Sequence, residues 1–393
     1  MPATRPILIA GGGIGGLALA LALTKVGRAC VVLERRERFA TEGAGIQIGP
    51  NGVRVLQQLG IADALRPLVG VPESIDVHEG SSGRLLARLP LGPWIAHRHG
   101  APYWVAHRGD LHGVLLAAVA ADVRVSIRAG FEVSSLTQTA DEVRVTSSAG
   151  ETLIGSALVG ADGLWSNVRA KLMPSAVPQF VGATATRAVI AADEAGRLNM
   201  PAVGLWLSRH AHVVHYPVRG GAQVAVVVIA VEDWRATDWD TEADRNVLLA
   251  QISGFDASLI KVLARVPAWR KWSLQRLASL PRWSNDRVAL LGDAAHPMLP
   301  YLAQGGVLAL EDALVFSQCL VVHAADEPSA FQAYETQRLR RATRVQAMSR
   351  RNGRIYHLAP PLSWARDAIL RWVPGAWLMS GYDWLYGWQP GAE

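Results

Sequence analysis

The chain has 393 residues, half of them apolar, which is enough to bury sizeable cores in two domains and excludes an intrinsically disordered protein. The formal net charge is +6, but the arginines are scattered and form only short clusters such as Arg338, Arg340, Arg341 and Arg344. We interpret them as solvated surface, since a nucleic-acid interface would need a basic stripe or a recognised motif. The two cysteines make no disulfide framework, which favours a reducing cytoplasm, and no uncharged apolar run is long enough to span a membrane.

The first predicted elements are a strand, a glycine-rich turn, a helix and a second strand. The turn Gly11-Gly12-Gly13-Ile14-Gly15-Gly16 separates the apolar run 7–10 from a helical run, and Glu34 ends the next apolar run. This order is typical of a dinucleotide-binding unit: the first glycine permits a tight turn, the next lets the backbone approach a pyrophosphate, and the last lets helix and strand pack closely. Glu34 can accept hydrogen bonds from a ribose diol and would repel a 2′-phosphate. The pattern therefore predicts FAD or NAD as the ligand rather than NADP.

The remaining elements follow in chain order and alternate between nucleotide-binding segments and sheet segments. We expect a helix from Pro50 to the stop at Gly60, strands over 71–104, a helix from 108 through 119, antiparallel strands over 123–133 and 142–147, a buried strand at 158–161, strands over 181–231 with a hairpin at Gly220-Gly221, a buried strand at 288–291, and helices over 306–322 and 330–350. The fold class is therefore α/β, with a Rossmann-like nucleotide-binding domain, an interleaved, mainly antiparallel β-sheet domain and a helical C-terminus. The first domain is discontinuous and takes residues 1–70, 105–175 and 285–350, the sheet domain takes 71–104 and 176–284, and the C-terminal segment takes 351–393.

Two further motifs each follow a predicted strand. The first is Asp162-Gly163-Leu164-Trp165-Ser166-Asn167-Val168-Arg169, where Ser166 or Asn167 can cap the next helix. The second is Gly292-Asp293-Ala294-Ala295-His296-Pro297, followed by Gln304-Gly305-Gly306. A carboxylate at the end of a strand is well placed to bind sugar or ribityl hydroxyls, and the glycines let backbone N–H groups approach a flat ring at a helix start. We read His296 as shaping its loop, and Glu311 and Asp312 as helix-surface or structural charges.

The three motifs, in this order and spacing, resemble those of the group A flavoprotein monooxygenases, which have the para-hydroxybenzoate hydroxylase fold. The resemblance extends to Glu34-Arg35, Gly43-Ala44-Gly45-Ile46-Gln47, His107-Arg108-Gly109-Asp110-Leu111 and Asp383-Trp384-Leu385-Tyr386-Gly387. Within that family the chain is most similar to the branch of salicylate hydroxylase, 3-hydroxybenzoate 6-hydroxylase and 6-hydroxynicotinate 3-monooxygenase. The resemblance implies an FAD-dependent enzyme in which NAD(P)H reduces the flavin and O₂ then forms a C4a-hydroperoxyflavin that hydroxylates a small aromatic ring.

The resemblance also implies which residues bind the cofactors. FAD is expected at Gly11, Gly13, Ile14, Gly15, Gly16, Glu34, Arg35, Arg108, Asp162, Asp293, Gly305, Gly306 and Val307. The Asp162-Gly163 segment is tied to the nicotinamide nucleotide as well, for which we favour NADH over NADPH, and no metal ion is expected. Relatives more often have alanine where this chain has Gly306, so we expect a looser helix start there.

A phenol substrate must lose its proton, which points to a base near the ring. In a strand through His212-Val213-Val214-His215-Tyr216, alternate residues share a face, so His212 and Tyr216 point one way and His215 points the other. In the resembling hydroxylases, a His and a Tyr at this spacing line the substrate pocket. We therefore assign His212 as base, Tyr216 as hydrogen-bonding partner and Gln304 as a further substrate contact, against the alternative that His212 is a sheet histidine without a role. Arg187 and Arg219 are candidates for a substrate carboxylate.

Two other functions remain open at this point. One is an epoxidase or hydroxylase of a larger, non-phenolic substrate on the same scaffold, which would not need His212. The other is a flavoprotein without oxygenase turnover that serves electron transfer or interaction. Five tryptophans near the end of the sequence suggest a packed cover or a subunit contact, as in a homodimer: Trp364, Trp372, Trp377, Trp384 and Trp388.

Overall fold

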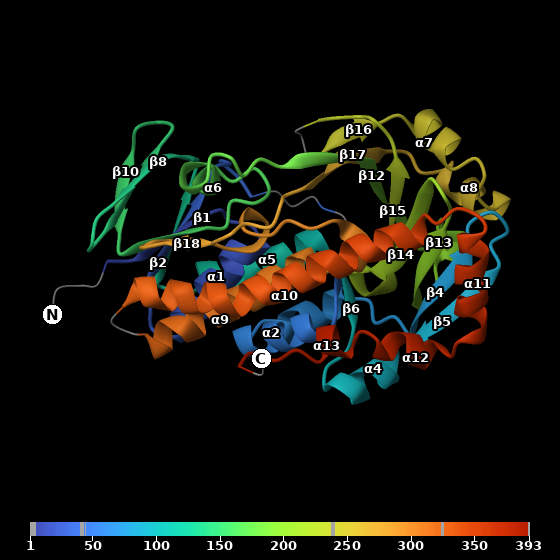
Figure 1. The fold of residues 1–393 in the computed structure, drawn as a ribbon, viewed down its shortest axis with the longest axis horizontal. Helices are drawn as coiled ribbons and strands as arrows, with labels where there is room; N and C mark the ends of the chain where they lie inside the picture. The colour runs from blue at the N-terminus through green and yellow to red at the C-terminus, as the bar shows by residue number, and fades with distance from the viewer. Residues whose placement is uncertain (1–4, 40–42, 44, 237–239, 324–325, 392–393) are drawn as a thin grey trace.

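The computed structural model describes every residue except 1–4, 40–42, 44, 237–239, 324–325 and 392–393. The molecule is elongated, with one large sheet towards each end and the long helix α10 (Glu327–Tyr356) running between them (Figure 1). This mixed α/β architecture with a helical C-terminal part agrees with the predicted fold class. The predicted domain boundaries stay a prediction.

A six-stranded sheet carries the N-terminal glycine turn. Its order is β18 (Ser284–Asn285), β19 (Val288–Leu290), β11 (Ala157–Gly160), β1 (Ile7–Ala10), β2 (Cys30–Glu34) and β7 (Val125–Ala129). All neighbours pair in parallel except β18, and β1 and β11 are buried at every residue, as expected for parallel strands covered on both faces. The expectation of an antiparallel strand over 123–133 is wrong, because β7 pairs in parallel with β2.

The helices beside this sheet begin within about three residues of where the sequence patterns place them. They are α1 (Ile14–Lys25), α2 (Pro50–Leu59), α5 (Arg108–Ala120), α6 (Asn167–Leu172) and α9 (Gly305–Val322), and α1 packs against both α5 and α9. In the described part of the chain, α9 is the one helix whose length and apolar composition would allow it to cross a membrane, and it is mostly buried inside the molecule. Its apolar character is therefore accounted for by its place in the core.

An eight-stranded sheet forms the other end. Its order is β16 (Thr241–Ala243), β17 (Trp269–Arg276), β12 (Gln179–Ala191), β15 (Gln223–Val231), β14 (Ala211–Val218), β13 (Ala202–Leu207), β4 (Ser74–Glu79) and β5 (Leu85–Pro90). Neighbours are antiparallel except β13 and β4. One face packs against α7 (Arg245–Gln251) and α8 (Ala257–Leu263), and the other lines a cavity.

Smaller elements connect and cover the two sheets. They are the pair β3 (Gly45–Ile48) and β6 (Trp104–His107), the three-stranded sheet β10 (Thr152–Gly155), β9 (Val143–Ser147) and β8 (Val133–Gln138), and the helices α3 (Ala62–Leu65), α4 (Gly92–His99), α11 (Leu362–Trp372), α12 (Gly375–Ser380) and α13 (Asp383–Tyr386). The prediction of strands alone over 71–104 missed α4. Trp388 and Leu385 are buried, whereas Trp364, Trp372 and Trp377 are largely exposed, so only part of the C-terminal aromatic group forms a packed cover.

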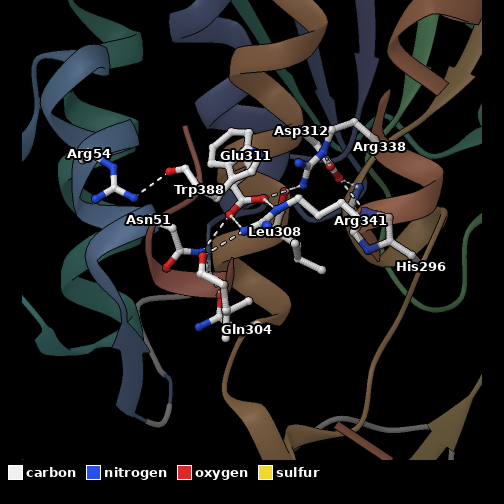
Figure 2. Close-up of polar contacts among 12 residues, drawn as sticks. Asn51, Arg54, His296, Gln304, Leu308, Glu311, Asp312, Arg338, Arg341 and Trp388 are labelled. Atoms are coloured by element: carbon white, nitrogen blue, oxygen red, sulfur yellow. Dashed lines mark hydrogen bonds and ion pairs between the residues drawn. The ribbon is translucent and has the colours of Figure 1, made fainter. Parts of the chain in front are cut away.

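A buried cluster of charges joins α9 to α10 (Figure 2). Both oxygens of Glu311 accept hydrogen bonds from Arg341, at 2.6 and 2.7 Å, and Oε2 also accepts one from Arg338 at 2.8 Å. Asp312 pairs with Arg338 Nε at 2.7 Å. These two arginines and two carboxylates are almost fully buried, so reading these arginines as solvated surface was wrong. Of the two alternatives for Glu311 and Asp312, the structure supports structural charges and not helix-surface charges. Burial demands that each charge be paired, and here each one is.

Candidate active site

Two neighbouring cavities share the backbone around the glycine turn. The larger, about 420 Å³, lies between the cavity face of the eight-stranded sheet and the ends of the parallel strands, and the smaller, about 190 Å³, lies beside Glu34. Gly13, Ala161 and Gly163 line both. A single extended ligand can therefore pass from one cavity to the other across Gly13, where an added side chain would meet no protein atom within 4 Å.

The glycine turn is held in a conformation that side chains would disrupt. Gly11 has φ +108°, and a Cβ there would lie 2.3 Å from the carbonyl oxygen of Ala161. A Cβ on Gly16 would lie 1.9 Å from the carbonyl oxygen of Gly11. Glu34 Oε2 accepts a hydrogen bond from the backbone N–H of Gly12 at 2.9 Å, which orients its carboxylate beside the smaller cavity. Arg35 lines the same cavity.

The Asp162 motif is tied to the strand ends on both sides. Asp162 Oδ2 accepts a hydrogen bond from the N–H of Val168 at 3.1 Å, and Ser166 Oγ caps α6 by accepting from the N–H of Arg169 at 2.9 Å. The Arg169 guanidinium donates to the carbonyl of Ala294 at 3.0 Å, which connects this motif to the Gly292-Asp293 turn. Burial raises the pKa of Asp162, which lines the smaller cavity.

Asp293 and Arg108 face the larger cavity from different elements. Asp293 lies in the turn after β19 and Arg108 at the first residue of α5. Burial raises the pKa of Asp293, against the opposing effect of His296 and Arg108, and burial lowers the pKa of Arg108. Asp312 fixes the turn itself: its Oδ2 accepts from the N–H of Gly292 at 3.1 Å and lies 2.6 Å from His296 Nε2. His296 therefore shapes its loop, as expected.

The start of α9 closes one side of the larger cavity. Gly305 and Gly306 line it, while Val307 is fully buried behind them. A Cβ on Gly306 would lie 2.7 Å from Cδ1 of Ile46, so alanine here would require the Ile46 side chain to move. This close approach gives a packing reason for glycine at this position.

The sheet contributes His212 and Tyr216 to the same cavity, with Val214 between them. His215 points the other way and bonds the carbonyl of Leu198 through Nδ1 at 3.1 Å, so the predicted alternation along β14 is confirmed. Burial lowers the pKa of His212 well below its ordinary value, with a contribution from His357, and burial raises the pKa of Tyr216. A neutral imidazole is the form that can accept a proton.

Gln304 has a different environment from the one expected. Its Oε1 accepts a hydrogen bond from Asn51 Nδ2 at 3.0 Å, and Asn51 also donates to Glu311 Oε1 at 2.7 Å (Figure 2). Gln304 is buried and is not among the described residues that line the larger cavity. The structure therefore places it in the link between α2 and α9, and its contact with a substrate stays a prediction.

The two arginines proposed for a substrate carboxylate lie in different places. Arg187 lines the larger cavity, where it pairs with Asp240 at 2.9 Å and lies over the Trp272 ring. Arg219 pairs with Asp110 at 3.6 Å and is absent from the described lining residues. Tyr386, from the C-terminal motif, also lines this cavity. Sequence reasoning missed a group of cavity-lining polar side chains, which carry no motif and come from distant segments: Tyr103, Tyr301, Asn352, Tyr356 and Tyr382.

Comparisons with known proteins agree with this geometry. A family described as "FAD binding domain" matches residues 4–349. The 3-hydroxybenzoate 6-hydroxylase of Klebsiella oxytoca is 34% identical over 97% of this chain and 96% of its own length. The 6-hydroxynicotinate 3-monooxygenase of Pseudomonas fluorescens is 34% identical over 88% of this chain and 90% of its own length. Among solved structures, Klebsiella pneumoniae HpxO in complex with FAD and uric acid superimposes with a TM-score of 0.86 at 25% identity, covering 97% of this chain and 96% of that one.

Proposed function

We propose a substrate class and residue roles from the premise that the chain belongs to the FAD-binding-domain family of flavoprotein aromatic hydroxylases. The chain is an FAD-dependent monooxygenase, with NAD(P)H and O₂ as co-substrates. The predicted resemblance to the 3-hydroxybenzoate and 6-hydroxynicotinate branch is confirmed by the relatives.

The residues around the glycine turn and the two cavities fit FAD. We assign the smaller cavity, with Glu34, Arg35 and Asp162, to the adenosine half of FAD, and the open face of Gly13 to its pyrophosphate. Asp293 and Arg108 would bind the ribityl and flavin half, beside the α9 start. That helix start presents free N–H groups, which favour negative charge. When bound, FAD supplies the electron transfer from NAD(P)H and the activation of O₂.

We assign His212 as the base that accepts the substrate's hydroxyl proton, and Tyr216 as a hydrogen-bonding partner of the same hydroxyl. The observation that carries this assignment is that both side chains line the cavity that Asp293, Arg108 and Gly305 also line. The low pKa of His212 keeps it neutral at physiological pH, and its burial excludes competing water. A phenolate is more electron-rich than a phenol, so this deprotonation activates the ring.

The substrate class we propose is a small aromatic acid with a ring hydroxyl, either a hydroxybenzoate or an N-heteroaromatic counterpart. The names of the relatives support this class. Arg187 is the cavity-lining cation that we assign to the substrate carboxylate, and we propose NADH as the reductant.

The test is product formation from hydroxybenzoates and hydroxynicotinates with NADH. His212→Ala should lower the rate of hydroxylation by about 10²–10⁴-fold, the usual contribution of general acid–base catalysis. FAD content and flavin reduction by NADH should remain close to wild type.

His215→Gln is the matched control, since His215 is buried on the same strand but faces the opposite side. We expect it to retain hydroxylation. Full activity in His212→Ala would favour the alternative of a larger, non-phenolic substrate, and bound FAD without substrate-stimulated NADH oxidation in the wild type would refute the proposal.

We also infer a cytoplasmic location and a homodimer. Cys30 and Cys319 are both free and buried, as suits a reducing compartment. The exposed tryptophans of α11 and α12 support a subunit contact, which a measurement of solution mass would test.

A further inference from the structure

His212 is held by a second histidine that no motif identified. Its Nδ1 lies 3.0 Å from Nε2 of His357, the residue directly after α10. The rings of Tyr301, Tyr356 and His357 surround it, with centroids 5.5, 5.3 and 5.1 Å from its own. Because Nδ1 is engaged by His357, Nε2 is the ring nitrogen left to meet a ligand in the cavity that His212 lines.

The two imidazoles form an uncharged pair at neutral pH. Burial lowers the pKa of His357 to about 4, helped by nearby Arg366 and His210, and burial with His357 lowers that of His212. Two neutral imidazoles carry one ring proton each, and one of these lies in the hydrogen bond between them. If His357 donated it, Nε2 of His212 would carry a proton and could accept none. If His212 donates it, Nε2 presents a lone pair.

We propose that His357 is a positioning residue that accepts a hydrogen bond from Nδ1–H of His212 and so leaves Nε2 of His212 unprotonated towards the substrate. The inference rests on the proposed function of His212 as base. In the step concerned, the substrate O–H bond breaks, its electron pair stays on the ring oxygen, and a new N–H bond forms at Nε2. The resulting imidazolium keeps its hydrogen bond to His357, which holds the ring in the same orientation as the proton transfers.

The fold fixes His357 from two sides. Arg366 of α11 donates to the carbonyls of Ile355 and Tyr356, at 3.0 and 2.8 Å, which secures the end of α10 immediately before His357. Asn352, one turn earlier, donates to the carbonyl of Tyr301 at 3.4 Å. The position of His357 is therefore fixed by the same end of α10 that contributes residues to the cavity wall.

The groups facing the pair come from four elements. Tyr301 lies on the turn before α9, Tyr356 ends α10, Arg366 lies on α11, and His210 lies on the turn before β14. Burial raises the pKa of both tyrosines, so neither titrates near neutrality. The two tyrosines therefore stay protonated across the acid and neutral range in which the pair is tested.

The test compares His357→Ala, His357→Gln and wild type. In His357→Ala, both tautomers of His212 become populated and water reaches its ring, so its pKa should rise towards the ordinary value. We expect hydroxylation at neutral pH to fall about tenfold, less than the 10²–10⁴-fold usual for loss of the base itself. The acid limb of the pH–rate profile of His357→Ala should move to higher pH, and this variant should consume more NADH per molecule of product formed.

His357→Gln should restore most of the rate, because an amide oxygen can accept the same hydrogen bond. His210→Ala is the matched control: it removes an exposed imidazole near His357, and the pH profile of this variant should stay close to wild type.

The inference fails if His357→Ala keeps the acid limb of the wild-type pH profile and the wild-type ratio of NADH consumed to product formed. It also fails if His357→Gln is as impaired as His357→Ala. Failure of the proposed function is a separate outcome, since the wild type would then yield no hydroxylated product from any phenolic acid. FAD content and thermal midpoint report whether each variant folds, and a folded His357→Gln keeps the test valid if His357→Ala does not fold.

Discussion

At the scale of single residues, a local motif in the sequence predicts the position of a side chain well. A side chain whose position depends on contacts with distant segments cannot be predicted in this way. Glu34 ends a strand, Asp162 and Asp293 each follow one, and strand ends meet at one edge of a parallel sheet. Gln304 also adjoins a motif, yet its side chain turns to Asn51, 253 residues away in the sequence. His357 lies 145 residues from His212, and no spacing in the sequence reports such a contact.

Arg187 allows a prediction about substrate selection. Arg187→Gln should raise KM for a hydroxybenzoate about 10–100-fold, since a hydrogen bond to a charged group contributes about 1.5–3 kcal/mol. The corresponding phenol without a carboxylate is the matched substrate, and its KM should hardly change. Equal effects on both substrates would contradict the assignment of the carboxylate to Arg187.

At the scale of elements, hydrophobic periodicity predicted strands and helices that have one polar and one apolar face. It did not predict whether neighbouring strands pair in parallel or antiparallel. The alternation along β14 is readable because its two faces differ: one meets the cavity and the other packs on α7 and α8. The direction of β7 is set by its partner β2, some ninety residues earlier, and local alternation does not encode it. The short helices α7 and α8 begin directly after Asp244 and Asp256, whose carboxylates cap them, and seven residues are too few to show a period.

The α9–α10 contact predicts a large stability effect. Glu311→Gln removes the charge that balances Arg338 and Arg341, which would lower the free energy of unfolding by about 3–5 kcal/mol, as expected when one partner of a buried ion pair is lost. Asp233→Asn, in an exposed pair with Arg235, should change it by less than about 1 kcal/mol. Urea denaturation of both variants measures the difference, and a similar small change in each would contradict the structural role of the cluster.

At the scale of the whole molecule, the larger cavity is lined by strands of the eight-stranded sheet and by the segments that follow strands of the six-stranded sheet. Helix α10 runs from one sheet towards the other (Figure 1). Near its start, Glu327 pairs with both Arg28 and Arg287, beside the six-stranded sheet. Near its end it leads to His357, beside the eight-stranded sheet. A global property such as acid stability should therefore reflect buried groups in both halves.

Buried histidines predict how stability depends on pH. Burial, with His78 and Arg197 nearby, lowers the pKa of His215 to about 4, and that of His357 is also about 4. Below about pH 6.5, the ordinary value for histidine, the unfolded chain binds protons that the folded chain does not. The free energy of unfolding should therefore fall as pH drops from about 6.5 to 4, by at most about 1.4 kcal/mol per pH unit for each histidine.

Urea denaturation across this range measures the slope, and His215→Gln should make it shallower. A slope in that variant equal to wild type would show that His215 is protonated as readily in the folded state as in the unfolded one.

The guanidinium of Arg54 on α2 donates to the backbone carbonyls of His99, Tyr386 and Trp388. Two of these three acceptors are synthesised more than 330 residues after Arg54 itself. During translation, α2 can form early, yet its cation must stay hydrated until the segment around Trp388 has left the ribosome. The contact between α2 and the C-terminal segment is thus completed late in biosynthesis, however early the dinucleotide-binding strands begin to associate.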